Sequence, residues 1–225
     1  LNQNTTANYN TGLGHHSLIL NTTGTQNTAV GSFSLDANTT ADNNSALGYG
    51  ALSSNTTGAA NTAVGREALN QNTTGSNNTA VGKDALILNT TGTQNVAVGN
   101  EALDSNTTAS GNTACGSFSL SANTTGQFNT GIGGSVLFDN TQGGSNTAVG
   151  YASLANNTTA NNNTAVGKDT LAANTTGTGN TAVGAGALDT STTASYNTAV
   201  GGNALDATTT GGTNVAVGYE SLGAN

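Results

Sequence analysis

Apolar side chains recur along this chain at a fixed spacing of 17 residues. When each repeat is counted from an asparagine, leucine occupies position 9 of every repeat from Leu18 to Leu222, and Leu1 belongs to the same series. Glycine fills position 5 of every repeat, and threonine fills position 13 wherever the repeat is long enough to contain it. The repeats begin, without insertion or deletion, at Asn10, Asn27, Asn44, Asn61, Asn78, Asn95, Asn112, Asn129, Asn146, Asn163, Asn180, Asn197 and Asn214. Such periodicity predicts a stacked array in which each repeat buries its apolar face on its neighbours.

The short period predicts an all-β fold, a parallel β-solenoid or β-roll with one 17-residue coil per repeat. Helical repeats need roughly 33 to 34 residues for two helices. Residues 61–65 (Asn-Thr-Ala-Val-Gly) alternate like a strand, with positions 2 and 4 on one face and position 3 on the other. We interpret positions 4 and 9, with position 2 beside them, as the core, and the small residue at position 3 as a place where another backbone approaches. A helical turn at 68–72 is the alternative, which the glycine and threonine in every repeat disfavour.

Stacking places each invariant residue against its own copy in the next coil, because coils lie about 4.8 Å apart. The sequence therefore predicts ladders of asparagine amides, and a turn with positive φ at the position-5 glycine. Thirteen coils at this spacing would form a rod of roughly 60 Å.

The composition is uniform from end to end, which predicts a single repeat array over residues 1–225, with about thirteen coils starting at Asn10. Charged residues make up only 6% of the chain, and the unbroken phase of its apolar residues argues against disorder. Because the chain opens at position 9 of a repeat and closes at position 12, we expect it to be a fragment of a longer array.

Each repeat offers about one leucine, one valine and some alanine, so a lone solenoid would have a thin core. We therefore expect a homo-oligomer in which several chains cover the alanine and glycine face, with end-to-end filaments as an alternative. The net charge of −8 argues against a nucleic-acid partner and against docking on anionic membranes. No apolar run is long enough to insert into a bilayer.

Isolated reactive side chains give no catalytic or metal site. Cys115 occupies position 4, where we expect a small buried apolar side chain, and a lone cysteine supports neither a disulfide nor a zinc site. His15 and His16 share one turn, with no cysteine or carboxylate beside them, which favours a solvated turn over a metal site. No nucleophile, base and orienting group converge, so we expect no enzyme activity and no cofactor.

The densest charge lies in three consecutive repeats. Glu67, Asp84 and Glu101 would lie one above another, and Arg66 and Lys83 would neutralise them locally. This pattern predicts an exposed charge ladder, with a calcium site as the alternative.

All nine aromatic residues occupy positions 6, 7, 10 or 17, and none is at an invariant position. We expect them at turns or on the outer surface, where they could stack on sugars or apolar partners, or simply pack on flanking side chains. The candidate surface-contact residues are Phe33, Tyr49, Phe118, Phe138, Tyr151, Tyr196 and Tyr219.

The segments 95–99 and 214–218, both Asn-Val-Ala-Val-Gly, resemble the Ser-Val-Ala-Ile-Gly signature of the YadA-like head repeats of trimeric autotransporter adhesins. Most other repeats replace the first valine with threonine, and such Asn-Thr-Ala-Val-Gly arrays also resemble parts of phage tail fibres and related surface fibres. The present repeat is longer than that of the adhesin heads, and its Asn-Thr-Thr tract would be the extra length. The resemblance implies a left-handed, homotrimeric, extracellular β-roll on a bacterial surface that attaches to glycans or other host-surface ligands.

The sequence thus predicts a non-catalytic structural and adhesive fibre segment of a cell-surface adhesin, and a phage tail-fibre segment is the first alternative. The second is an ice- or surface-binding solenoid that uses the threonine ladder at positions 13 and 14, for example Thr73 and Thr74. Adjacent residues point to opposite faces, so only one of these two ladders can face outward. An enzyme on a solenoid scaffold is disfavoured, because it would need clustered acids, bases or a metal.

Overall fold

A computed structural model describes residues 3–223 of the chain, so Leu1, the first member of the leucine series, lies outside the described residues. Packing of the backbone separates two compact units, residues 1–111 and residues 112–225. Both units are built in the same way, with one three-residue strand in each coil and bends and turns between strands. Residues 3–223 contain no helix.

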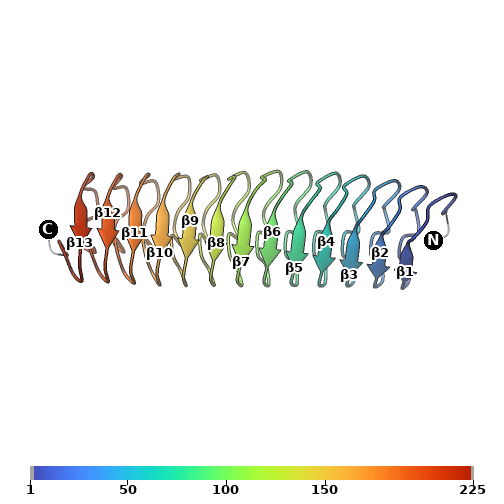
Figure 1. Cartoon of the computed structure of the whole chain (residues 1–225), viewed down its shortest axis with the longest axis horizontal. Coiled ribbons are helices and arrows are strands. Elements are labelled where there is room, and N and C mark those ends of the chain that lie inside the picture. The colour runs from blue at the N-terminus through green and yellow to red at the C-terminus, as the bar shows by residue number, and fades with distance from the viewer. Residues whose placement is uncertain (1–2, 224–225) are drawn as a thin grey trace. The chain divides into compact units, whose positions relative to one another are not determined.

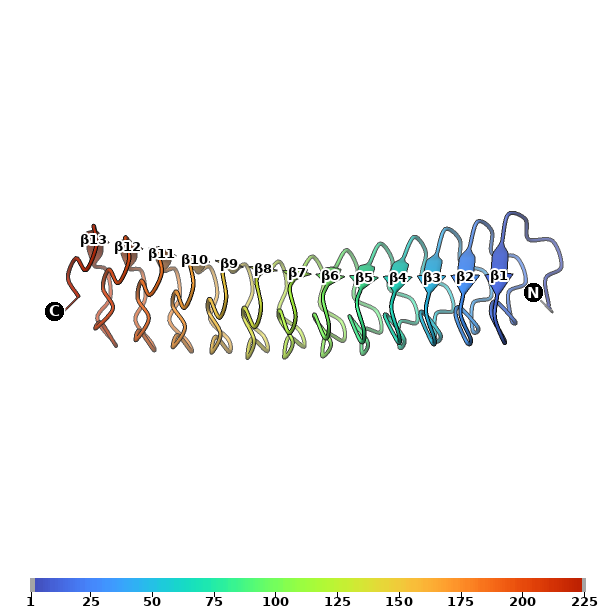
Figure 2. The ribbon, with the colours of Figure 1, turned by 90° about the horizontal axis from the view of Figure 1, so that it is seen from below.

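Strands within each unit pair in parallel and in chain order, side by side, and the bends that close each coil lie on the other side (Figures 1 and 2). The strands of the first unit are β1 (Thr11–Leu13), β2 (Thr28–Val30), β3 (Ser45–Leu47), β4 (Thr62–Val64), β5 (Thr79–Val81) and β6 (Val96–Val98). Those of the second are β7 (Thr113–Cys115), β8 (Thr130–Ile132), β9 (Thr147–Val149), β10 (Thr164–Val166), β11 (Thr181–Val183), β12 (Thr198–Val200) and β13 (Val215–Val217). The predicted parallel β-solenoid of 17-residue coils is confirmed.

The pairing brings each position of the repeat beside the same position of the next coil. Thr62 faces Thr79 and Ala63 faces Ala80 across the β4–β5 pair. The backbone N–H of Thr62 donates to the Asn78 carbonyl of the following coil at 2.9 Å. The backbone N–H of Gly65 donates instead to the Leu47 carbonyl of the preceding coil at 2.8 Å. Hydrogen bonds that alternate between the two neighbouring coils are the pattern of a parallel sheet.

The strands face the opposite way to our prediction. Alanine at position 3 points inward and is fully buried, as at Ala63. Positions 2 and 4 point outward, and Leu47 at position 4 is 50% exposed. Space inside the coil is limited, because a methyl group on Gly131 at position 3 would lie 2.9 Å from Ser119 Oγ and 3.0 Å from Val136 Cγ1. The apolar core therefore consists of positions 3, 8 and 9, together with position 15 where it carries alanine. The expected role of the alanine and glycine face as a contact between chains is wrong, because position 3 points inward.

Four positions of the repeat have positive φ in every coil, namely the glycine at position 5, the leucine at position 9 and the variable residues at positions 7 and 17. The position-5 glycine has positive φ, as predicted, with 136° at Gly65, where a methyl group would lie 2.4 Å from the Gly82 carbonyl oxygen. The position-9 leucine is also left-handed, with φ of 52° at Leu69, and its side chain is fully buried. A left-handed leucine is uncommon, so burial of the side chain has to offset its backbone strain.

Candidate functional site

Two asparagine rows hold successive coils together and confirm the predicted ladders. At position 12, Asn72 Nδ2 donates to Asn55 Oδ1 at 2.8 Å and to the Gly75 carbonyl at 2.9 Å. At position 1, the Asn61 backbone N–H donates to Asn44 Oδ1 at 2.9 Å, and Asn61 Nδ2 donates to the Gly75 carbonyl at 2.9 Å. These side chains are fully buried, so both rows serve the fold and offer no group to a ligand.

The two threonine rows differ in their exposure. At position 13, Thr73 Oγ1 donates to the Thr90 carbonyl of the next coil at 3.0 Å and is partly buried. At position 14, Thr74 and its counterparts in the neighbouring coils are exposed. Position 14 is thus the more exposed of the two rows, but both rows lie in bends and not in strands, and position 13 is mostly half-buried, so the predicted opposite orientation of the two ladders does not apply.

Positions 2 and 4 of the strands form the outward sheet face of each unit. Position 2 carries threonine, serine or valine, and position 4 carries valine, leucine, isoleucine or Cys115, so this face has no charged residue. In β1–β6 the exposed position-4 side chains are Leu13, Leu47 and Val98, and their exposed fractions run from 37% at Val98 to 66% at Leu13. The other position-4 side chains of this unit are half-buried. Cys115 is exposed as well, and our expectation that it is buried is wrong because position 4 points away from the coil interior.

Charged residues of positions 6 and 7 form local ion pairs, as the sequence predicted. Arg66 Nη2 lies 2.8 Å from Glu67 Oε1, and the hydrogen bond that Arg66 donates to Glu67 is the main cause that raises the pKa of Arg66. Lys83 pairs with Asp84 of its own turn and lies 3.7 Å from Glu101 of the next coil. Among residues 3–223, no group of three or more histidine, cysteine or carboxylate side chains is placed to hold a metal ion.

Aromatic side chains lie on the turns or the outer surface, which confirms their predicted location. In the first unit His15 and His16 stack at 3.9 Å, Phe33 meets both rings edge-on at 5.4 Å, and Phe33 meets Tyr49 at 5.9 Å. His15 and His16 are exposed, as a solvated turn requires. Their parallel stacked rings do not converge on a common ligand.

Five of the six aromatic residues of the second unit fall into two arrangements, and the sixth, Phe128, is 64% exposed. Phe118 and Phe138 meet edge-on at 6.4 Å. Tyr151, Tyr196 and Tyr219 are exposed, and each lies against a glycine of the preceding coil. A methyl group on Gly134, for example, would lie 3.5 Å from Tyr151 Cδ2.

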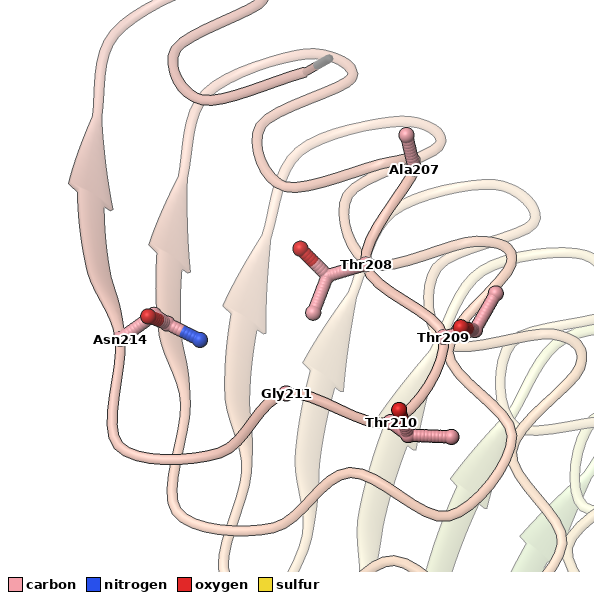
Figure 3. Close-up of a pocket in the computed structure, with 6 residues that line it drawn as sticks. All are labelled: Ala207, Thr208, Thr209, Thr210, Gly211 and Asn214. Atoms are coloured by element: carbon pink, nitrogen blue, oxygen red, sulfur yellow. The ribbon is translucent and has the colours of Figure 1, made fainter. Parts of the chain in front are cut away.

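One surface hollow lies at the turn that leads into β13 (Figure 3). Its volume is about 260 Å³. The lining residues are Ala207, Thr208, Thr209, Thr210, Gly211 and Asn214. This lining has hydroxyl and amide groups but no titratable side chain, so it provides no acid–base chemistry.

Comparison of the chain with protein-family models, with curated proteins and with solved structures finds no match. Among the described residues, no helix has the length and apolar character needed to cross a membrane. The fold defines the chain as a parallel β-solenoid repeat protein. Its surface features are the outward sheet face, the exposed threonine row at position 14 and the aromatic and charged turns at positions 6 and 7.

Proposed function

We propose that this chain is a non-catalytic structural and adhesive segment of an extracellular fibre, in which three copies pack through their outward sheet faces. The observation that carries the proposal is the outward row of apolar side chains at position 4, on a face that has no charged residue. The resemblance to trimeric adhesin heads supports three copies, wound in a left-handed sense.

The composition of the outward sheet face supports self-association. A sheet face that meets water normally carries polar residues, yet this face presents a row of valine, leucine and isoleucine side chains in each unit. Continuous exposed apolar surface of more than a few hundred Å² marks interaction sites. A second copy is the natural partner because it carries the same rows at the same 17-residue spacing, which lets apolar rows of two copies interdigitate.

Adhesion would come from the variable turns. Positions 6, 7, 10 and 17 change from coil to coil and present exposed side chains such as Tyr49 and Tyr151. Weak contacts repeated along one chain and over three chains add up through avidity. A bacterial surface adhesin and a phage tail fibre would use the segment in the same way, with host glycans or other surface ligands as partners.

The single cysteine provides a direct test of the packing. In a parallel assembly through the outward sheet face, the Cys115 side chains of the copies would lie at the same level. A short bismaleimide should then link two copies at high dilution, and light scattering should give a mass near three times 21.8 kDa.

The matched control moves the thiol to another face of the same coil. The variant with Cys115→Val and Thr125→Cys places it at the exposed position-14 row, and it should remain unlinked. A monomer mass at every concentration would overturn the proposed assembly.

The exposed threonine row supports a second candidate, a solenoid that binds ice or another regular surface. Thr74 and Thr91 belong to a regular outward row, which Gln142 interrupts in the second unit. Thermal hysteresis of a concentrated solution would favour this candidate, and its absence would exclude it.

A further inference from the structure

We propose that each unit carries one binding subsite for a neutral pyranose sugar, formed by an exposed tyrosine and an ion pair of the following coil. In the first unit this tyrosine–ion pair site consists of Tyr49, Arg66 and Glu67. In the second unit it consists of Tyr151, Lys168 and Asp169. The inference rests on the proposed adhesive function and names the ligand class that the turns would bind.

The two sites have the same construction. Each tyrosine is at position 6 of its coil, and the cation and carboxylate follow at positions 6 and 7 of the next coil. The backbone N–H of Glu67 donates to the Tyr49 carbonyl at 2.9 Å, and that of Asp169 donates to the Tyr151 carbonyl at 3.0 Å. The stacking of coils therefore fixes the aromatic residue beside the ion pair in both units.

The rings are supported on one side and open on the other. Tyr49 is 53% exposed and meets Phe33 edge-on, with ring planes 77° apart. Tyr151 is 59% exposed and lies against Gly134, whose lack of a side chain leaves space for the ring. A ring held in place before binding loses little freedom when a ligand stacks on it. The apolar C–H face of a pyranose is a suitable partner for such a surface.

The ion pairs supply complementary polar groups. Arg66 pairs with Glu67 at 2.8 Å, and Lys168 pairs with Asp169. A carboxylate accepts hydrogen bonds from sugar hydroxyls, and a guanidinium or ammonium group donates to them. Exposed ion pairs of this kind add little to folding stability. Two of the three such pairs at positions 6 and 7 follow a coil with an exposed tyrosine at position 6, and Lys83–Asp84 does not.

The surrounding charge favours a neutral sugar over an acidic one. Glu67 is the main cause that raises the pKa of Arg66, and the charge of Asp84 adds to it. In the same way, Asp169 is the main cause that raises the pKa of Lys168, with a smaller contribution from the charge of Asp189. Each cation is thus compensated by more than one carboxylate, and the chain as a whole carries a net charge of −8. A sialylated or sulfated glycan would meet net repulsion.

The test is binding of the full chain to printed neutral oligosaccharides of glucose, galactose and N-acetylglucosamine, beside sialylated ones, followed by calorimetry with the best neutral oligosaccharide. The double variant Tyr49→Ala/Tyr151→Ala should bind at least tenfold more weakly. The control Tyr9→Ala/Tyr196→Ala removes two exposed tyrosines that belong to neither site and should bind like the original chain. Glu67→Gln/Asp169→Asn keeps both rings and should also weaken binding.

Three results would overturn this inference: no retained neutral oligosaccharide, equal loss in the test and control variants, or binding confined to sialylated sugars. Light scattering on the same samples separates this inference from the fibre proposal. A trimer that binds no neutral sugar would contradict the subsites alone, whereas a monomer that binds one through Tyr49 and Tyr151 would contradict the trimer alone.

Discussion

Among single residues, the position-12 asparagine has the most demanding role. Its side chain carries both a donor and an acceptor, so identical copies can hydrogen-bond in an indefinite stack. Asn157 Nδ2 donates to Asn140 Oδ1 at 2.7 Å, and Asn174 Nδ2 donates to Asn157 Oδ1 at 3.0 Å. The next coil has Ser191 at this position, and the following one has Thr208. Neither side chain carries the amide donor that continues the ladder.

We predict that Ser191→Asn stabilises the protein. Asn174 Oδ1 and Ser191 Oγ are buried and have no hydrogen-bond partner. An amide at position 191 would donate to Asn174 Oδ1, and relief of a buried unpaired polar group is worth about 1–3 kcal/mol. The measurement is the free energy of unfolding from chemical denaturation. Ser32→Asn is the control, because Asn100 already occupies the same position-6 turn in another coil; equal effects of both changes would contradict the argument.

Residue types alone revealed the ladders but not which strand face is buried. Alternation places positions 2 and 4 on a common face, but the alternation alone does not determine which of the two faces points inward. The sequence favours the position-4 valine for the core because it is the more hydrophobic residue. The structure instead buries the small alanine at position 3. One coil of the sequence does indicate that position 3 is buried. Gly131 replaces the usual alanine in the same coil in which the larger Val136 occupies position 8, as expected if the two side chains share a limited interior volume.

Within one coil, the turn around the invariant leucine was beyond sequence reasoning. Local preference argues against a leucine with positive φ, since the left-handed conformation costs roughly 1–2 kcal/mol. Complete burial of the leucine side chain is worth roughly 1.5–3 kcal/mol, which offsets that strain. The tight turn thus depends on packing between coils, as at Leu86 and Leu103. The local sequence alone therefore could not predict it.

The turn at position 10 also leads to a prediction about pH. Burial, followed by the charges of Asp169 and Asp206, raises the pKa of Asp189 above its ordinary value of 3.8. A carboxyl group with a raised pKa in the folded state destabilises the protein while it is ionised, that is, above the folded pKa. That penalty disappears as pH falls below the unfolded value, because the group is then protonated in both states.

Asp189→Asn should therefore raise the melting temperature at pH 7 and lose this advantage near pH 3. Melting followed by circular dichroism at both values measures the effect. Asp139→Asn changes another half-buried aspartate of the same unit, at position 11 of its coil, and is the control. A gain for Asp189→Asn that is the same at both pH values would contradict the electrostatic cause.

For the whole molecule, the periodic sequence was sufficient to predict the solenoid, because every coil repeats the same core and the same ladders. The candidate sites were only partly predictable. The aromatic residues could be placed at turns from their absence at invariant positions, but the supports beneath Tyr151 and Tyr49 depend on neighbours one coil away. The tyrosine–ion pair sites could be recognised only in the structure, because the tyrosine and the ion pair of each site lie in consecutive coils.

The outward sheet face gives the last prediction, which concerns assembly. Val64 and Val81 are half-buried neighbours at position 4 of β4 and β5, and they point away from the coil interior. Val64→Asp/Val81→Asp should leave the fold intact, because water still reaches these positions in a single chain. Between chains the same carboxylates would be desolvated without partners, at a cost of several kcal/mol per ion. Light scattering should then show the mass falling toward 21.8 kDa while circular dichroism stays unchanged.

The control places the same charges on the exposed threonine row of the same two coils. Thr74→Asp/Thr91→Asp adds two carboxylates at position 14, which are exposed and take no part in the outward sheet face. Because both double variants change the net charge by the same amount, general repulsion between chains would lower their masses equally. A fall in mass for the valine variant alone locates the interface on the outward sheet face, whereas equal masses for both variants would place the contact between chains elsewhere.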